Sequence, residues 1–380
     1  MVKNKPVYAF EEADSKNRIL LGGKGAGLSE MTRLKLPVPV GFTITTEVCN
    51  KYYDDDKKLP KDVMPAVMKN IAKMEKKTGK KWNSIKNPLL VSVRSGAATS
   101  MPGMMDTILN LGLNEKTVVG LAEQTKNPRF SWDSYRRFIQ LFGKVVFGVN
   151  DEKFDHVLDS AKEKQGITDD SKLNVESLKI IVLQYKKICE EHTKRKFPDT
   201  PDEQLVLSIE AVFKSWMGER AIVYREKNNI TKDIANGTAV NIVAMVFGNM
   251  GDDSATGVVF TRNGHNGKKE MEGEYLINAQ GEDVVAGVRT GASIELLKKD
   301  MPKSYKELSN ACTKLEKHFK EPQDIEFTIE QGKFYLLQTR TAKMSAGALV
   351  KTSVDMVKEK LIDKNKALTR IPAQQLEALL

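Results

Sequence analysis

The sequence predicts an α+β protein in which a long helical region separates two groups of strands. Short apolar runs bounded by Gly and Pro occur up to about residue 112, and strand signals dominate again from Val240 onward. Between Leu113 and Pro198 the apolar residues instead recur at the helical spacing, among many Lys/Glu pairs. A chain of 380 residues is long enough for two or three domains, each with its own core.

The apolar periodicity places the individual elements. Before the helical region we expect a strand at 7–10, a Gly-rich turn at 21–27 leading into a helix at 28–34, a strand at 41–45, a helix at 63–77 and a strand at 89–95. Helices are expected at 138–146, 178–189 and 204–216. Strands follow at 240–247, 256–262, 273–278, 324–329 and 333–339, and the tail from residue 344 to residue 380 is expected to be helical.

Composition indicates a soluble cytoplasmic protein. Charged residues make up 29% and hydrophobic residues 40% of the chain, and no apolar run approaches the ~20 residues that span a bilayer. The first residues lack the apolar core of a secretory signal. Three widely spaced cysteines favour reduced structural thiols over a disulfide framework. The net charge of +10 permits nucleic-acid binding, but the chain has no helix-turn-helix, zinc-finger or aromatic RNA motif. We therefore expect neither nucleic acid nor membrane as a partner.

Two N-terminal segments carry cations beside small residues. Lys24 lies within Gly22-Gly-Lys-Gly-Ala-Gly27, and glycines before a helix allow backbone N–H groups to approach an anion. A structural helix-entry turn explains this run equally well. Arg94 ends an apolar strand and precedes a loop of Ser, Gly, Ala and Thr, where a guanidinium can meet phosphate oxygens. Met105, with Met101 and Met104, is either an apolar wall for a nucleobase or core packing.

Two further segments contain small or acidic residues next to strands. The stretch 247–260 joins two strands through a small-residue turn, which could fold over a triphosphate and present backbone donors from Ser254 to Gly257, including Thr256. A plain hairpin is the alternative. Glu282 and Asp283 lie in a loop after a strand, where a second metal contact or a ribose hydroxyl could be bound.

The segment 324–340 reads as two strands around a Gly turn, with polar residues at alternating positions. Asp324 and Glu326 share one strand face, as do Gln338 and Arg340. An odd-residue or bulged loop at Gly332 would place Glu326 opposite Gln338 and Asp324 opposite Arg340, whereas a regular two-residue turn would separate them. Oxygen ligands beside a planar cation suit Mg²⁺ and phosphates. An exposed face with two salt bridges is the alternative.

In these residues and motifs the chain resembles the nucleotide-binding region of the pyruvate, phosphate dikinase family, which has an ATP-grasp fold with an inserted helical subdomain. The likeness covers nearly the whole sequence. Its most specific blocks are Ser-Met-Pro-Gly-Met-Met-Asp-Thr at 100–107 and the segment 324–340. Phosphoenolpyruvate synthases share the Gly-Gly-Lys-Gly run, the Val-Arg-Ser strand end and the terminal Gln-x-Arg, but not the Met-rich block.

The resemblance implies a magnesium- and ATP-binding phosphotransferase that also uses phosphate. Lys24, Arg94 and Arg340 would hold the triphosphate and stabilise charge during transfer. Glu326 and Gln338 would ligate Mg²⁺, with Asp324 supporting them. Val243, Ala244 and Met245 would contact adenine.

Two positions depart from the family pattern. Val243 stands where the family has Gln, so recognition of the base would rest on backbone groups. Asp253 and Ala255 stand where the family tends to have Thr and Gly, and an acid beside phosphates weakens affinity unless it points away.

The resemblance also implies partners that this sequence lacks: a swivelling phosphohistidine domain and a barrel domain for pyruvate and phosphoenolpyruvate, in cis or in trans. We therefore expect a fragment of the dikinase that does not complete the reaction alone. A non-catalytic nucleotide sensor, or the nucleotide domain of a phosphoenolpyruvate-synthase-like enzyme, is the alternative. The expected domains are an N-terminal subdomain at 1–112 with 200–240, a helical subdomain at 113–199, a C-terminal subdomain at 241–343 and a helical linker at 344–380.

Overall fold

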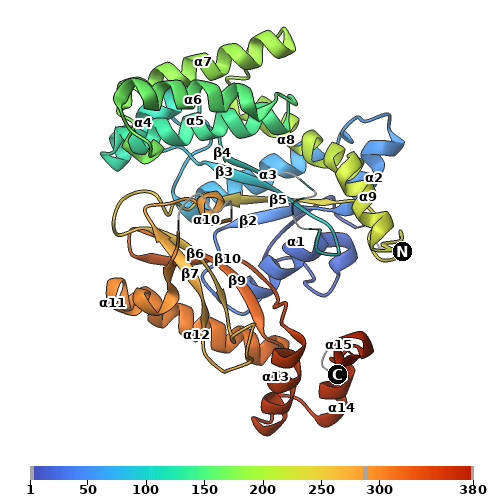
Figure 1. Ribbon diagram of the computed structural model, residues 1–380. Helices are drawn as coiled ribbons and strands as arrows, with labels where there is room; N and C mark the ends of the chain where they lie inside the picture. Colours follow the sequence, from blue (N-terminus) through green and yellow to red (C-terminus); the bar gives the residue numbers. More distant parts are fainter. Residues whose placement is uncertain (1–3, 102, 104, 106, 286–289, 378–380) are drawn as a thin grey trace. The chain divides into compact units, whose positions relative to one another are not determined.

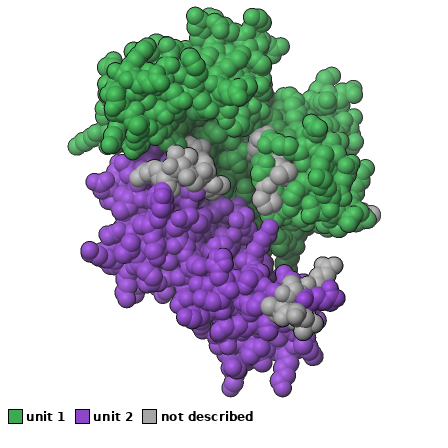
Figure 2. Space-filling view, in the orientation of Figure 1, with its two compact units in different colours: residues 1–30, 39–245 green, residues 31–38, 246–380 purple. Residues whose placement is uncertain are grey.

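The computed structural model describes residues 4–377 apart from 102, 104, 106 and 286–289. The chain divides into two compact units (Figure 2). Unit 1 comprises Met1–Glu30 and Pro39–Met245, and unit 2 comprises Met31–Val38 and Val246–Leu380. Within the described residues, each unit contains one five-stranded sheet together with helices (Figure 1). This combination confirms the predicted α+β class.

The sheet of unit 1 is antiparallel and has the strand order β1-β2-β5-β3-β4. Its strands are β1 (Val7–Ala9), β2 (Gly41–Ile44), β3 (Val91–Gly96), β4 (Thr107–Leu111) and β5 (Ala239–Ala244). The central strand β5 is the last of them in the sequence, and all six of its residues are buried. A strand that is paired on both edges and covered by helices needs this nearly continuous apolar composition.

The helices that precede β5 are α1 (Arg18–Arg33), α2 (Thr46–Asp54), α3 (Val63–Thr78), α4 (Glu115–Thr125), α5 (Pro128–Val145), α6 (Asp151–Gln165), α7 (Val175–Thr193), α8 (Pro201–Trp216) and α9 (Glu219–Lys227), with a short 3-10 helix at Asp170–Lys172. In unit 1, α8 packs on β3, β4 and β5, and α5 packs on β4. Helices α4 and α7 pack on α5, and α6 packs on α7, so α4–α7 form one helical layer (green in Figure 1).

Polar residues at the helix starts fix the boundaries of this helical layer. Asn114 accepts hydrogen bonds from the N–H groups of Lys116 and Thr117 and forms a capping box with Thr117. Asn150 caps α6 by accepting from the N–H of Glu152, and Asn174 caps α7 by accepting from the N–H of Ser177. Because such caps satisfy N–H groups that the first helical turn leaves without partners, the sequence encodes these boundaries locally.

Helix α5 buries a carboxylate between two arginines. Asp133 is 4% exposed; its Oδ1 accepts from Arg136 Nε at 2.8 Å and its Oδ2 from Arg137 Nε at 3.1 Å. Burial alone would raise the pKa of Asp133, but the charges of Arg136 and Arg137 hold it well below its usual range. The ionised carboxylate is therefore part of the folded state.

Replacing Asp133 by Asn is expected to destabilise unit 1 by about 3 kcal/mol, since the buried Arg136 would lose its closest carboxylate and keep the more distant Asp170, at 3.3 Å. The pKa of Asp133 is depressed in the folded state, so its contribution is fully present above the ordinary carboxyl pKa of about 3.9 and is lost progressively as pH falls from there through the depressed folded-state pKa. Urea unfolding at pH 7 and at pH 3 measures both effects. Asp151→Asn, which removes an exposed ion pair with Lys144, is the control and should cost less than about 1 kcal/mol. Equal losses in the two variants would contradict the prediction.

The sheet of unit 2 is also antiparallel and has the order β10-β9-β6-β7-β8. Its strands are β6 (Ala255–Phe260), β7 (Glu272–Ile277), β8 (Ala292–Ser293), β9 (Gln323–Glu330) and β10 (Lys333–Thr341). Ile325, Phe327 and Ile329 alternate along β9 and are fully buried. The alternation puts Asp324 and Glu326 on the opposite sheet face.

The helices of unit 2 are α10 (Gly281–Val285), α11 (Leu297–Asp300), α12 (Pro302–Phe319), α13 (Ala346–Lys358), α14 (Lys364–Thr369) and α15 (Ala373–Glu377), with a 3-10 helix at Ile294–Leu296. Helix α12 packs on β9 and β10 (Figure 1). In the part of the chain that the structure describes, no helix has the length and apolarity needed to cross a membrane.

The three cysteines are free thiols in the core. Cys49, Cys189 and Cys312 are all buried, as expected for structural thiols. Burial raises the pKa of each thiol to about 12, so each stays protonated and unreactive at neutral pH.

The main local error of the sequence prediction concerns the Gly-rich run. A turn was expected at 21–27, but these residues are helical within α1, apart from a break at Gly22 with φ 68° and ψ 164°. The expected domain division remains a prediction. One of its boundaries splits β5, which pairs with β2 and β3 and lies wholly in unit 1.

Candidate functional site

In unit 1, the Gly-rich start of α1 lies directly against the end of β3. Gly23 N donates to the carbonyl of Ala97 at 2.7 Å, and a Cβ on Gly22 would lie 1.9 Å from the carbonyl oxygen of Gly96. A Cβ on Gly96 would in turn lie 3.3 Å from the Cβ of Lys24. The glycines therefore allow helix and strand backbones to touch.

This contact brings the two predicted cations of unit 1 to the same strand end. Arg94 lies two residues before Gly96, so both project from the same face of β3, and Lys24 packs on that face. Both side chains are half-buried. The structure thus places Lys24 and Arg94 at the same end of β3, although they are 70 positions apart in the sequence.

A buried polar pair beneath them was missed by the sequence analysis. Asn241 is fully buried in β5; its Oδ1 accepts from Thr43 Oγ1 at 2.8 Å and its Nδ2 donates to the carbonyl of Arg94 at 3.4 Å. A Cβ on Gly25 would lie 2.7 Å from Asn241 Oδ1. Asn241 therefore supports both cation-bearing segments. The sequence feature that could have revealed it is the single amide side chain in the otherwise apolar run Ala-Val-Asn-Ile-Val-Ala.

The residues expected to contact a base are buried. Val243 is 3% exposed, and Ala244 and Met245 are each 9% exposed. The N–H of Ala244 donates to Val40 O at 2.8 Å, and the N–H of Met245 donates to Leu90 O at 2.9 Å. The expected recognition of adenine through backbone groups cannot use these two donors while the sheet stays paired.

The methionines of the Met-rich block differ in exposure. Met101 is 6% exposed, which fits core packing, and Met105 is half-buried. Met104 lies outside the described residues. Met105 therefore keeps some surface for contact with a ligand.

In unit 2, the β9–β10 hairpin pairs the four polar residues as expected, but by a different device. Gln331 and Gly332 form a two-residue turn with φ 48° and 72°, and Lys333 pairs with Glu330. The register then shifts between Leu336 and Gln338. The irregularity expected at Gly332 is thus wrong in position: a bulge at Leu337 adds the extra residue and restores the pairing.

Beyond the bulge, Gln338 lies opposite Glu326 and Arg340 lies opposite Asp324. Gln338 Nε2 donates to Glu326 Oε1 at 3.0 Å, and Arg340 Nε donates to Asp324 Oδ2 at 2.7 Å. The Asp324 side chain is 10% exposed and that of Arg340 is 44% exposed. One face of this hairpin therefore presents two carboxylates, an amide and a guanidinium at its partly open end.

These groups match the chemistry of a magnesium–phosphate site. Carboxylate and amide oxygens are hard ligands of the kind Mg²⁺ takes, and a guanidinium binds phosphate oxygens. Because Gln338 donates through Nε2, its Oε1 is the atom that can ligate a cation. Asp324 already pairs with Arg340, and the described residues contain no cluster of three or more His, Cys, Asp or Glu side chains that could hold a metal. A metal here would thus need ligands beyond acidic side chains.

Strand β6 pairs with β9 and contains two residues that were expected to lie in a turn. Thr256 and Gly257 lie in the strand, paired with both β7 and β9, not in the turn before it. Thr256 Oγ1 donates to Phe327 O at 3.1 Å, and a Cβ on Gly257 would lie 2.7 Å from the Phe327 ring. Both residues therefore serve the packing of the sheet, and their role as phosphate donors stays a prediction.

The turn before β6 is fastened to the tip of the β9–β10 hairpin. Ser254 Oγ accepts from Gln331 N at 3.0 Å, and the carbonyl of Asp253 accepts from Gly332 N at 2.8 Å. The N–H of Phe247 donates to Glu330 Oε2 at 2.7 Å. Asp253 Oδ1 accepts from the Ser254 hydroxyl at 3.1 Å. The carboxylate that departs from the family pattern therefore has a hydrogen-bond partner in its own turn.

The loop predicted to follow β7 contains the short helix α10. Asp283 Oδ2 accepts from Gln280 N at 2.9 Å and so caps this turn. The side chain of Glu282 lies outside the described residues. A metal or ribose contact by Glu282 therefore stays a prediction.

Comparison with known proteins places the chain in a family. The family model described as pyruvate phosphate dikinase, AMP/ATP-binding domain, matches residues 18–57, 55–306 and 301–361. The chain belongs to this family. The pyruvate phosphate dikinase family was the resemblance drawn from the Met-rich block and from segment 324–340, and the match confirms it.

Curated members of the pyruvate phosphate dikinase family align along nearly the whole chain. The pyruvate, phosphate dikinase of Entamoeba histolytica is 54% identical over 98% of this chain, and that of Clostridium symbiosum is 50% identical over 99%. Pyruvate, phosphate dikinase 1 of Arabidopsis thaliana, a chloroplastic protein, is 47% identical over 100%. The chain spans 42%, 43% and 40% of these three relatives, respectively.

Proposed function

We propose that the chain is the nucleotide-binding phosphotransferase module of a pyruvate, phosphate dikinase. It binds Mg²⁺-ATP and phosphate and passes a phosphoryl group to a histidine on another domain. A further domain would then transfer that group between the histidine and pyruvate, with phosphoenolpyruvate as the product. The observation that carries the proposal is the shared face of Asp324, Glu326, Gln338 and Arg340 on β9–β10. The family match and the relatives named pyruvate, phosphate dikinase support it.

Glu326 and Gln338 are the proposed magnesium ligands. Their side chains already touch, at 3.0 Å, so their oxygens can converge on one cation without a change of register. Mg²⁺ held by these two residues would supply positive charge that offsets the negative charge of the phosphates. Asp324 orients Arg340 through their 2.7 Å ion pair, and the remaining N–H groups of that guanidinium can bind phosphate oxygens.

Lys24 and Arg94 are the proposed phosphate-binding cations of unit 1. Phosphoryl transfer requires positioned charge more than covalent assistance from the protein. The rigid contact of α1 with β3 holds both cations at one strand end, supported by Asn241. Arg94, with its planar fork of donors, suits two phosphate oxygens at once, whereas Lys24 acts as a point charge.

Removing either the guanidinium of Arg340 or the carboxylate of Glu326 is expected to weaken binding of Mg²⁺-ATP. Arg340→Ala and Glu326→Ala should each raise the Kd by at least about tenfold, because each removes a charged group worth at least about 1.4 kcal/mol. Titration calorimetry with and without Mg²⁺ measures this. In Glu326→Ala, the advantage of Mg²⁺ over metal-free ATP should also shrink.

Lys333→Ala provides the control, because Lys333 is an exposed cation at the turn end of the same hairpin. Its Kd should stay within about twofold of wild type. Wild-type affinity in both Arg340→Ala and Glu326→Ala would rule out the proposed site.

A further inference from the structure

Helix α13 is docked on the segment that follows β6. Ser345 N donates to the carbonyl of Gly264 at 2.9 Å, and its hydroxyl donates to His265 O at 2.8 Å. A Cβ on Gly267 would lie 2.7 Å from Ala348 O, so helix and segment are in direct backbone contact. The helix thus starts at a fixed place on unit 2.

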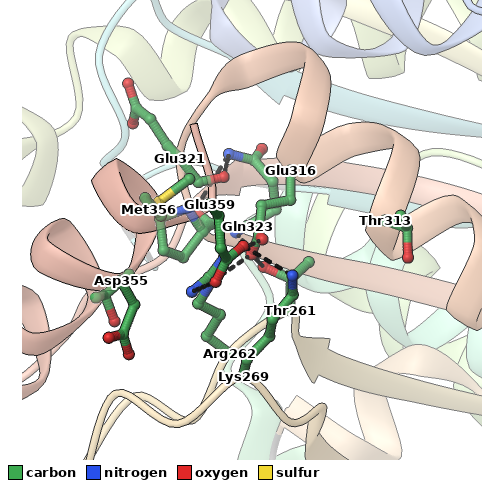
Figure 3. Close-up of polar contacts among 12 residues, drawn as sticks. Thr261, Arg262, Lys269, Thr313, Glu316, Glu321, Gln323, Asp355, Met356 and Glu359 are labelled. Carbon is green, nitrogen blue, oxygen red and sulfur yellow. Dashed lines mark hydrogen bonds and ion pairs between the residues drawn. The ribbon is translucent and has the colours of Figure 1, made fainter. Parts of the chain in front are cut away.

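At the other end of α13, a buried arginine joins the helix to the core (Figure 3). Arg262 is 0% exposed and lies between two carboxylates: Glu316 of α12 and Glu359, which follows α13. Its Nε and Nη2 donate to Glu316 at 3.0 and 2.7 Å, and its Nη1 and Nη2 donate to Glu359 at 3.0 and 2.8 Å. Both pairs are bidentate, which fixes direction as well as distance.

Two cations and two carboxylates are in direct contact in this cluster. Arg262 and Lys269 face Glu316 and Glu359, and Lys269 Nζ contacts Glu359 at 2.7 Å from the solvent side. Burial alone would lower the pKa of Arg262, but the two carboxylates raise it above its ordinary value. Undocking α13 would remove one of the two carboxylates from a buried cation, which is unfavourable.

The same cluster reaches the strand ends that carry the candidate site. Thr261 Oγ1 donates to Glu316 Oε2 and accepts from Gln323 N, each at 2.9 Å. Gln323 Oε1 accepts from the hydroxyl of Thr339 at 2.9 Å. Gln323 directly precedes Asp324, and Thr339 directly precedes Arg340. Every step from Glu359 to the Asp324–Arg340 pair is therefore a hydrogen bond or a peptide bond.

We propose that Arg262, Glu316 and Glu359 are positioning residues that hold the ends of β9 and β10, and thereby couple the docking of α13 to the binding of Mg²⁺-ATP. The nucleotide part of this inference rests on the proposed function. Coupling between two events is reciprocal: if docked α13 strengthens ATP binding, bound ATP must strengthen the docking of α13. A contact that served stability alone would show no such reciprocity.

Glu359→Gln tests the coupling, because it keeps the shape of the side chain and removes the charge that Arg262 binds. Asp355→Asn is the matched control: it is the same chemical change on α13, at a residue paired with Lys351. We expect the Kd for Mg²⁺-ATP to rise about fivefold or more in Glu359→Gln and to stay within about twofold in Asp355→Asn. Mg²⁺-ATP should slow amide hydrogen exchange of α13 in the wild type, and less so in Glu359→Gln.

Hydrogen exchange without nucleotide separates this inference from the proposed function. In Glu359→Gln, the amides of residues 323–325 and 339–341 should exchange faster than in Asp355→Asn. If the wild type fails to bind Mg²⁺-ATP, the proposed function fails, and this comparison still decides whether the cluster positions the strands. Should Glu359→Gln not fold, Lys269→Gln gives the same comparison from the solvent side. Unchanged exchange at both strand ends overturns the inference.

Discussion

Insertion of one alanine between Gln338 and Thr339 is expected to weaken Mg²⁺-ATP binding by at least about a hundredfold. The inserted residue would move Thr339 opposite Asp324 and would turn Arg340 to the face where Ile325 is fully buried. Asp324 would lose its 2.7 Å partner, and the phosphate-binding cation would leave the site. Titration calorimetry against the wild type measures the loss.

Deletion of Leu337 is the informative control for this insertion. Without the bulge residue, Gln338 would follow Leu336 directly and would still pair with Glu326 in a regular ladder after the two-residue turn. Its affinity for Mg²⁺-ATP should therefore stay within about fivefold of wild type. Tight binding by the insertion variant, or equal losses in both variants, would show that facing along β10 does not govern the site.

Gly22→Ala is expected to destabilise the protein by more than about 4 kcal/mol. The combination of φ 68° and ψ 164° at Gly22 belongs to a region that only glycine enters readily, and the added Cβ would lie 1.9 Å from the carbonyl oxygen of Gly96. Relief would require α1 to move away from β3, which would also displace Lys24. Urea unfolding measures the change in the free energy of unfolding.

Gly79→Ala separates backbone strain from collision. Gly79 ends α3 with φ 72°, and a Cβ there would meet no atom within 4 Å. The variant should lose only about 1 kcal/mol. If Gly22→Ala were no less stable than Gly79→Ala, the close approach of α1 to β3 would not be the reason for glycine at position 22.

The hairpin shows what a sequence can predict about this site. Side chains alternate along a strand, so the faces of Asp324, Glu326, Gln338 and Arg340 followed from spacing alone, and the need for one extra residue followed from parity. Parity does not state where that residue lies. A three-residue turn and a bulge at Leu337 satisfy it equally, and the choice depends on packing of Leu336 and Phe334 into the core.

The Gly-rich run and Asn241 show where local reasoning fails. A run of glycines predicts a turn because the residues have no helical preference. In this chain the run is helical, and its glycines are required by partners far away in the sequence: Gly22 lies against the backbone of Gly96, and Gly25 lies against the side chain of Asn241. Likewise, Asn241 supports the segments of Lys24 and Arg94 through contacts with Thr43 and with the carbonyl of Arg94. Only the fold brings these partners together.

The position of β5 has a consequence for the order of events during synthesis. β1 and β2 pair with each other, as do β3 and β4, and among the strands that the structure describes β5 is the one that joins the two ribbons. Since β5 is the last of these strands to leave the ribosome, the ribbons and the helices translated before Ala239 must wait with their sheet edges unpaired. Such long-range closure is slow and exposes aggregation-prone edges. We therefore expect nascent chains of unit 1 to need protection of these edges until residue 244 has emerged.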